Sequence, residues 1–305
     1  MLPSPLPDYN SPSRLRLFLE SRGLGARKRY GQNFLINPGA RTRLLDALEL
    51  PRAGAVWEPG PGLGAMTAPL LEQGGDVTAF EIDAGFSSVL RDIFGGQANF
   101  TLIEGDMLKT WPGAGNRGDY LLGNLPYNTG AALLADFIEK GKFFTRMVVT
   151  VQKETGRRMC ARPGEADYSS FSVLCASRYR ITPLFSLKGS AFYPEPRVES
   201  LALRLDLRED GPFRSFPPPA SFFPLLRALF ASRRKTVKNN LERFIASSSL
   251  MMTKTAAEWC AALLARSGVA GDSRAETLDL AAIVSLAESF DALAGPAREK
   301  GLPRG

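Results

Sequence analysis

The chain has 305 residues, of which 44% are hydrophobic and 23% charged, so the length predicts two domains and the composition predicts a folded protein with a sizeable core. The formal net charge of +7 favours an anionic partner, of which nucleic acid is the commonest for a soluble protein. The sequence contains no histidine, which excludes Ser/His/Asp and Cys/His catalysis and histidine-ligated metals.

The N-terminal segment, residues 1–25, is rich in Pro, Ser and Arg. We expect it to form a loosely ordered tail, with a short helix near residues 15–22. It contains no apolar run of the kind that a secretory signal needs. The next predicted helix covers residues 37–48, because Asn37 can cap it and Pro38 occupies its first turn.

Short apolar segments then alternate with helical ones as far as residue 151. Strands are expected at residues 55–57, 77–81, 100–104, 120–122 and 147–151. The intervening helices are expected at residues 66–73, 86–93 and 131–138. Such an alternation predicts βαβ units and a parallel sheet that helices cover on both faces.

The pattern changes in the last third of the chain. Strands at residues 179–185 and 201–207 are expected to form an antiparallel pair that closes the sheet. A proline-rich linker at residues 212–224 follows. Helices are then expected at residues 222–231, 236–246, 255–267 and 276–291. These patterns predict a tail (1–25), an α/β domain (26–210) and a small all-helical C-terminal domain (211–305).

A glycine-rich turn, Glu58-Pro-Gly60-Pro-Gly62-Leu-Gly64, follows the first strand of the predicted sheet. Glycines at such a turn let the backbone approach a ligand closely. The turn also fits the dinucleotide fingerprint, so taken alone it leaves a nicotinamide cofactor and S-adenosylmethionine both open. Glu81 and Asp106 follow the next two strands, where carboxylates can accept hydrogen bonds from ribose hydroxyls and an adenine amino group. The sequence therefore predicts an adenosine pocket at the carboxyl edge of the sheet.

The segment Asn124-Leu125-Pro126-Tyr127 follows the fourth strand. The Asn124 side-chain oxygen and a neighbouring backbone carbonyl can accept both N–H groups of an adenine N6, so that its lone pair faces a methyl donor. Pro126 fixes the turn, and the ring of Tyr127 offers an extruded base a stacking surface worth about 1–3 kcal/mol. The N–H becomes acidic once the nitrogen attacks, so positioning suffices and no histidine is required. We place catalysis on this segment.

Together these motifs resemble those of the ribosomal RNA adenine N6,N6-dimethyltransferases of the kasugamycin-sensitivity type, over about residues 27–245. The segment Arg27-Lys-Arg-Tyr-Gly-Gln-Asn-Phe-Leu35 resembles the N-terminal signature of that family, whose Asn and Leu contact the cofactor. The resemblance implies a Rossmann-like class I S-adenosylmethionine-dependent methyltransferase with a mostly parallel seven-stranded sheet. The cofactor contacts that it implies are Asn33, Leu35, Gly60, Gly62, Glu81, Asp106 and Asn124.

Two further segments carry the resemblance towards the RNA. Residues 191–200 resemble a Phe-containing loop of the family, which implies that Phe192 sandwiches the target base against Tyr127. Residues 233–241 resemble the basic segment that opens the family's helical domain. The candidate RNA-binding residues are Arg27, Lys28, Arg29, Arg233, Arg234, Lys235 and Lys238. Residues 128–132 depart from the family pattern, so the choice between one and two methyl groups stays open.

The resemblance implies a substrate as well: two adjacent adenines in a loop near the 3′ end of small-subunit (16S) RNA, within the 30S particle or its precursor. It also suggests a monomer. Three alternatives stay open: a large-subunit RNA methyltransferase of the macrolide-resistance type, a non-catalytic assembly factor, and a nicotinamide dehydrogenase. The last of these lacks a proton-transfer residue and leaves the Asn-Leu-Pro-Tyr turn unexplained.

The remaining composition bears on cellular location. The three cysteines, Cys160, Cys175 and Cys260, are scattered and form no CxxC pair, so we expect reduced thiols, no metal site and a cytoplasmic protein. No apolar run approaches the roughly 18 residues that a membrane span needs. We therefore expect no membrane partner.

Overall fold

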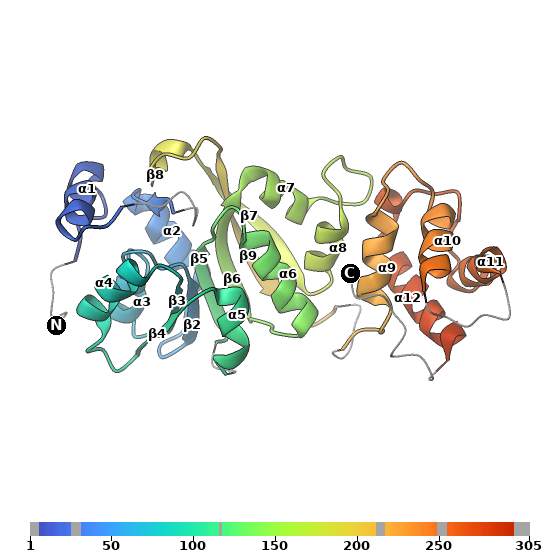
Figure 1. Ribbon diagram of the computed structural model, residues 1–305, viewed down its shortest axis with the longest axis horizontal. Helices are drawn as coiled ribbons and strands as arrows, with labels where there is room; N and C mark the ends of the chain where they lie inside the picture. Colours follow the sequence, from blue (N-terminus) through green and yellow to red (C-terminus); the bar gives the residue numbers. More distant parts are fainter. Residues whose placement is uncertain (1–5, 26–31, 116–117, 212–216, 249–254, 296–305) are drawn as a thin grey trace. The chain divides into compact units, whose positions relative to one another are not determined.

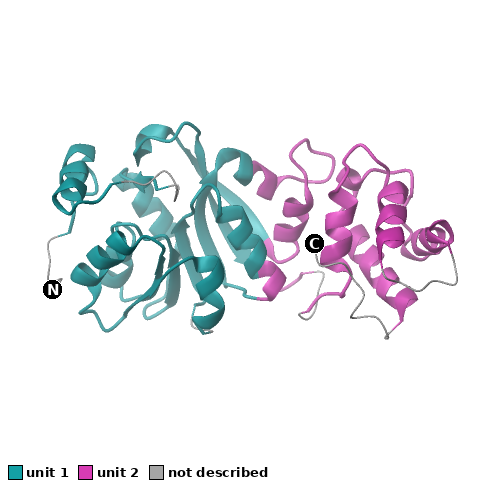
Figure 2. Cartoon of the chain, viewed as in Figure 1, with its two compact units in different colours: residues 1–137, 142–156, 180–207 teal, residues 138–141, 157–179, 208–305 magenta. Residues whose placement is uncertain are grey.

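A computed structural model describes residues 6–25, 32–115, 118–211, 217–248 and 255–295. The chain divides into two compact units, which Figure 2 colours separately. Unit 1 comprises residues 1–137, 142–156 and 180–207, and unit 2 comprises residues 138–141, 157–179 and 208–305. The expected domain boundaries near residues 25 and 210 stay a prediction. Within the described ranges, no helix has the length and apolar character that crossing a membrane requires.

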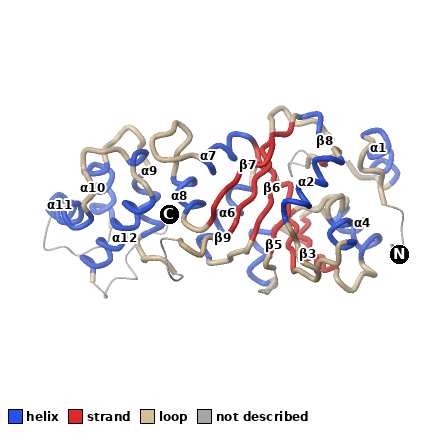
Figure 3. Tube along the Cα trace, turned by 180° about the vertical axis from the view of Figure 1, so that it is seen from behind, coloured by secondary structure: helices blue, strands red, loops and turns tan. Residues whose placement is uncertain are grey.

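Unit 1 contains a sheet whose seven strands lie in the order β4-β3-β2-β5-β6-β9-β7 (Figures 1 and 3). The strands are β2 (Ala55–Pro59), β3 (Asp76–Glu81), β4 (Phe100–Glu104), β5 (Tyr120–Asn124), β6 (Arg146–Gln152), β7 (Tyr179–Leu187) and β9 (Ser200–Leu207). The strands from β2 to β6 pair in parallel, whereas β9 runs antiparallel to β6. This arrangement confirms the predicted Rossmann-like α/β class and its mostly parallel seven-stranded sheet.

Helices cover both faces of the sheet. In unit 1 they are α2 (Pro38–Leu48), α3 (Thr67–Glu72), α4 (Ala84–Phe94), α5 (Met107–Thr110), η2 (Trp111–Gly113) and α6 (Gly130–Lys140). Helix α7 (Lys153–Cys160) begins directly after β6, and α8 (Ser170–Ala176) belongs to unit 2. Successive strand residues face opposite sides, so Val56 packs with Leu44 of α2 while Trp57 packs against Phe137 of α6. Burial on both sides explains why the strands are apolar throughout.

The N-terminal segment corrects one expectation. Residues 12–21 form helix α1 (Pro12–Ser21), and Ser11 caps it by accepting a hydrogen bond from the backbone of Arg14. Leu15 and Leu19 lie one helical turn apart and are only 1% and 3% exposed. They pack in one cluster with Phe86 and other residues of α4. The short helix predicted near residues 15–22 is therefore present and begins at residue 12. The prediction of a loosely ordered tail is wrong for residues 6–25, because the two leucines bury one face of this helix.

A small second sheet joins two segments that are far apart in the sequence. Strand β1 (Phe34–Leu35) pairs antiparallel with β8 (Phe192–Tyr193), which follows the short helix η3 (Gly189–Ala191). Asn37 caps α2 as predicted, since its Oδ1 accepts a hydrogen bond from Ala40 at 2.8 Å. This sheet brings the segment before α2 back to the carboxyl edge of the main sheet.

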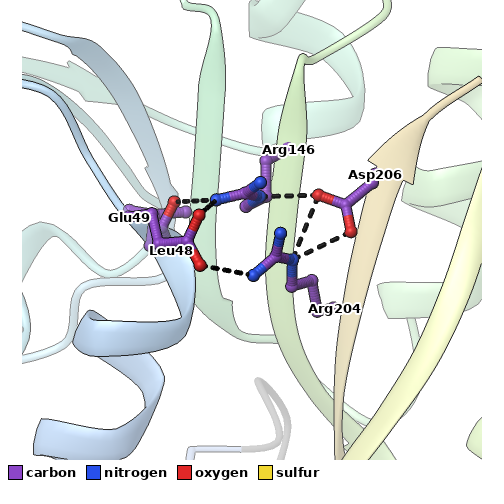
Figure 4. Close-up of polar contacts among 5 residues, drawn as sticks. All are labelled: Leu48, Glu49, Arg146, Arg204 and Asp206. Atoms are coloured by element: carbon purple, nitrogen blue, oxygen red, sulfur yellow. Dashed lines mark hydrogen bonds and ion pairs between the residues drawn. The ribbon is translucent and has the colours of Figure 1, made fainter. Parts of the chain in front are cut away.

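The C-terminal end of α2 is tied to the main sheet by a four-residue ionic network, shown in Figure 4. Arg146 of β6 donates to Asp206 of β9 at 2.6 Å and also pairs with Glu49. Arg204 bridges the same two carboxylates, at 2.8 Å to each. Arg146 also reaches the backbone carbonyl of Leu48 at 3.3 Å. The shared carboxylates anchor α2 to both β6 and β9.

Among its described residues, unit 2 ends in the helices α9 (Phe222–Phe230), α10 (Val237–Ser247), α11 (Ala256–Ser267) and α12 (Leu280–Ala294). A capping box of Thr255 and Glu258 begins α11. Helix α12 begins at residue 280 rather than 276, because Asp279 caps it and residues 275–277 form the separate turn η4 (Ala275–Thr277). The helical C-terminal region predicted from the sequence is confirmed.

Candidate functional site

The carboxyl ends of four adjacent strands meet at one edge of the sheet. Gly60, Glu81, Asp106 and Asn124 lie at or just after the ends of β2, β3, β4 and β5. The strand order reverses between β2 and β5, which is where ligands bind in open α/β sheets. A cavity of about 360 Å³ opens there. All seven predicted cofactor residues line it: Asn33, Leu35, Gly60, Gly62, Glu81, Asp106 and Asn124.

The glycine-rich turn has left-handed backbone angles that favour glycine. The φ values are +63° at Gly60, +60° at Gly62 and +88° at Gly64. A Cβ atom on Gly60 would meet nothing within 4 Å, whereas one on Gly62 would approach the ring of Phe34 at 3.0 Å. Gly60 therefore leaves its side of the turn open to the cavity, while Gly62 lets the turn and β1 come together.

Glu81 holds the glycine-rich turn in place from the end of β3. One carboxylate oxygen accepts a hydrogen bond from the backbone N–H of Gly62 at 3.1 Å, and the other accepts one from the backbone N–H of Asp83 at 2.8 Å. The side chain is 3% exposed, and burial raises its pKa to about 7 despite these bonds. Each carboxylate oxygen has a second lone pair, so Glu81 can also accept hydrogen bonds from a ligand in the cavity.

Two more carboxylates line the cavity. Asp106 caps the short helix α5 by accepting a hydrogen bond from Leu108 at 3.1 Å. Glu58, which the sequence analysis did not identify as a site residue, is 3% exposed and accepts a 2.6 Å hydrogen bond from Thr67. Burial raises the pKa of Glu58 to about 8. An acid inside an otherwise apolar strand was the available sequence signal for it.

Asn124 is held from both sides. Its Nδ2 donates a 2.8 Å hydrogen bond to the backbone carbonyl of Asn33, and its Oδ1 accepts one of 2.8 Å from the hydroxyl of Thr150. The next residue, Leu125, is buried, and its backbone N–H donates a 3.0 Å hydrogen bond to the Thr150 carbonyl. Asn124 and Pro126 line the cavity. The amide therefore has a defined orientation at the edge of the cofactor cavity.

The two predicted stacking residues lie outside the lining of this cavity. Tyr127 is partly buried, and its hydroxyl lies 2.6 Å from that of Ser200. Phe192 is 2% exposed and belongs to the hydrophobic cluster under α2. A base could stack on Phe192 only if that ring were uncovered, and the sandwich stays a prediction.

The candidate RNA-binding residues fall into two groups. Arg27, Lys28 and Arg29 lie outside the described residues. Arg233 makes contacts within unit 2, to the Glu276 carboxylate at 3.3 Å and the Ala166 carbonyl at 2.9 Å. Lys238 pairs with Glu242 at 3.8 Å. The side chains of Arg234 and Lys235 are exposed.

Comparison with known proteins identifies a family that the chain matches over most of its length. The model of the ribosomal RNA adenine dimethylase family matches residues 23–285. A protein of Treponema denticola named ribosomal RNA small subunit methyltransferase A is 43% identical, over 90% of this chain and 92% of its own length. A Treponema pallidum protein of the same name is also 43% identical, over 94% of this chain and 99% of its own length.

Two solved structures share the fold. A dimethyladenosine transferase from Plasmodium falciparum has a TM-score of 0.69 at 24% identity, covering 82% of this chain and 94% of its own. The 23S rRNA methyltransferase ErmE has a TM-score of 0.58 at 21% identity, covering 85% of this chain and 99% of its own. At these identities the two structures establish the architecture alone.

Proposed function

Since the chain belongs to the ribosomal RNA adenine dimethylase family, we propose that it dimethylates N6 of two adjacent adenines in a loop near the 3′ end of small-subunit (16S) RNA. The protein is an S-adenosylmethionine-dependent ribosomal RNA adenine methyltransferase. The small-subunit assignment is supported by the names of relatives that are 43% identical over nearly their whole length. The structural observation that carries the proposal is the fixed amide of Asn124 at the cofactor cavity.

The cavity residues fit S-adenosylmethionine. Gly60 leaves the turn open to a ligand, and the carboxylate of Glu81 would accept hydrogen bonds from the ribose hydroxyls. Asp106 would accept from the adenine amino group, and the exposed side chain of Ile82, which lines the same cavity, would offer the adenine an apolar surface. When bound, the cofactor supplies an electrophilic methyl group on its sulfonium sulfur.

The chain's own contribution to the reaction is to orient the adenine. Oδ1 of Asn124 uses one lone pair for Thr150 and keeps a second for an N6–H of the substrate. A backbone carbonyl of the Asn124–Pro126 turn would accept the other N–H, which directs the N6 lone pair towards the cavity. These weak acceptors suffice, because the N–H loses its proton only after the nitrogen has attacked. The ring of Tyr127 would hold the extruded base by stacking.

We propose that the partner is the 30S particle or its precursor. We also propose that the enzyme is a monomer and acts in the cytoplasm. Arg234 and Lys235 would contribute phosphate contacts. RNA bases reach such a site from single-stranded loops, where they can be extruded at low cost. The main alternative is methylation of large-subunit RNA, since ErmE shares the architecture. The degree of identity to the small-subunit enzymes favours the first assignment.

Acceptor preference tests this proposal. The full chain would be incubated with labelled S-adenosylmethionine and one of three acceptors: unmethylated 30S particles, 50S particles, or bare large-subunit RNA. We expect label in 30S particles alone. Label in the 50S particles or bare large-subunit RNA, with none in 30S, would assign the enzyme to the alternative. Cofactor binding without transfer to any acceptor would identify a binding protein that has lost turnover.

A further inference from the structure

Tyr9 lies upstream of the family match, which begins at residue 23, yet it lines the same cavity as Asn33 and Gly62. Its hydroxyl donates a 2.9 Å hydrogen bond to the backbone carbonyl of Leu63, inside the glycine-rich turn. The phenol is protonated at neutral pH and can donate there, and burial raises its pKa above the usual value. Tyr9 therefore forms part of the cavity wall and restrains the turn at the same time.

Tyr9 belongs to a well-anchored segment, residues 6–22, which we name the N-terminal strap. Leu15 and Leu19 of α1 are buried in the same cluster as Leu63 of the glycine-rich turn, and Leu15 also lines the cavity. At the end of the strap, Arg22 pairs with Asp92 of α4 at 2.8 Å. The strap is thus fixed to the helix that follows β3 and to the turn that follows β2.

Arg41 of α2 makes a second connection. One guanidinium nitrogen donates a 2.8 Å hydrogen bond to the backbone carbonyl of Leu35 in β1, and another donates to the side chain of Asn10 in the strap. The guanidinium also lies 5.8 Å from the ring centroid of Tyr9, within the range of a cation–π contact. Through Tyr9 and Arg41, the strap joins the two cavity walls formed by β1 and the glycine-rich turn.

We propose that the N-terminal strap is a cofactor-binding element, and that Tyr9 is a positioning residue for S-adenosylmethionine. Tyr9 holds the glycine-rich turn in the conformation that receives the cofactor and closes the cavity on that side. A turn restrained before binding loses less conformational freedom when the cofactor enters, which strengthens binding. The inference rests on the cofactor use stated under the proposed function, and it adds residues that the family match does not include.

Calorimetric titration of S-adenosylmethionine into the full chain tests this role. Tyr9→Phe keeps the ring and removes only the donor to Leu63, and we expect its Kd to rise by roughly 3- to 10-fold. Tyr9→Ala also opens the wall and should bind still more weakly. Tyr168→Phe is the matched control, because that hydroxyl also donates to a backbone carbonyl, Leu278 at 2.8 Å, but lies in unit 2. Its Kd should equal that of the wild type.

A kinetic measurement separates positioning from loss of folding. For Tyr9→Phe, the KM for the cofactor should rise while kcat and the KM for the RNA acceptor hold, since a smaller folded fraction would lower kcat alone. A wild-type Kd for Tyr9→Ala, or equal weakening in Tyr168→Phe, would overturn the proposal. A wild type that binds the cofactor but methylates no RNA would defeat the proposed function, while the Kd series would still decide the role of Tyr9.

Discussion

The hydroxyl of Thr150 donates a 2.8 Å hydrogen bond to Oδ1 of Asn124, from a position in β6 that is completely buried. An amide side chain can rotate to exchange its oxygen and nitrogen, and this bond helps to hold the oxygen in place for the substrate. The bond to the Asn33 carbonyl on the other side enforces the same orientation. The role that we propose for Asn124 therefore depends on a residue that does not itself line the cavity.

Thr150→Val tests this dependence, since it keeps the shape of the side chain and removes the donor. We expect kcat to fall by about 10-fold, because the Asn124 oxygen is less firmly directed at the adenine. The Kd for S-adenosylmethionine should change by no more than about twofold. Thr101→Val, at an exposed position of β4, is the control. An unchanged kcat in Thr150→Val would refute the orienting role of Thr150.

The stacking role of Tyr127 is tested by separating its ring from its hydroxyl. Tyr127→Phe loses the 2.6 Å contact with Ser200 but keeps the ring, and it should retain most activity. Tyr127→Ala should lose activity by roughly 10- to 100-fold, the worth of one stacked base. Phe192→Leu keeps an apolar side chain in the core and removes the second ring of the predicted sandwich. Single-turnover rates equal to wild type for both Tyr127→Ala and Phe192→Leu would exclude the sandwich.

If the exposed cations of unit 2 bind phosphate, they make the affinity for RNA depend on the salt concentration. Replacing Arg234 and Lys235 by Gln should flatten the dependence of RNA affinity on salt, by roughly 0.7–0.9 in the log–log slope for each lost phosphate contact. Arg52→Gln with Arg266→Gln removes the same charge from two other exposed positions and should leave the slope unchanged. Filter binding over a salt series measures both. Equal slopes for the two double variants would mean that Arg234 and Lys235 do not meet the RNA.

The raised pKa of Glu58 should make the stability of the fold depend on pH. Its pKa is about 8 in the folded chain against 4.5 for the unperturbed group, so folding favours the neutral form. Its contribution to stability is therefore complete below about pH 4.5 and is lost as pH rises through about 8. Glu58→Gln avoids the buried charge and should melt several degrees above the wild type at pH 9, with little difference at pH 5. Melting temperatures measured without cofactor would contradict this if Glu58→Gln and the wild type differed by the same amount at pH 5 and at pH 9.

Most of unit 1 could be predicted from the sequence, because its strands are short, apolar and separated by amphipathic helices. The proposed cofactor residues Gly60, Glu81 and Asp106 could be placed at the cavity for the same reason, since each lies at or just after the end of a recognisable strand. The hydrogen bond between Gly62 and Glu81 could not be predicted, because it joins loops at two neighbouring strand ends. The sequence pattern does not specify the conformations of those loops.

Elements held by distant partners were missed. Strands β1 and β8 have two residues each and form only because Leu35 meets Phe192, so neither has a local signal. Tyr9 was missed because the composition of the N-terminal segment suggested little order, whereas its two buried leucines decide its structure. The burial of Phe192 likewise depends on the packing of α2 over the sheet.

Nucleoside analysis of 16S RNA from unmethylated 30S particles, treated with the enzyme and S-adenosylmethionine, tests the proposed reaction directly. We expect two N6,N6-dimethyladenosines per particle with the wild type and none with Asn124→Ala, whose affinity for the cofactor should fall far less than its turnover. Absence of dimethyladenosine from the wild-type reaction, or near-normal formation by Asn124→Ala, would contradict it.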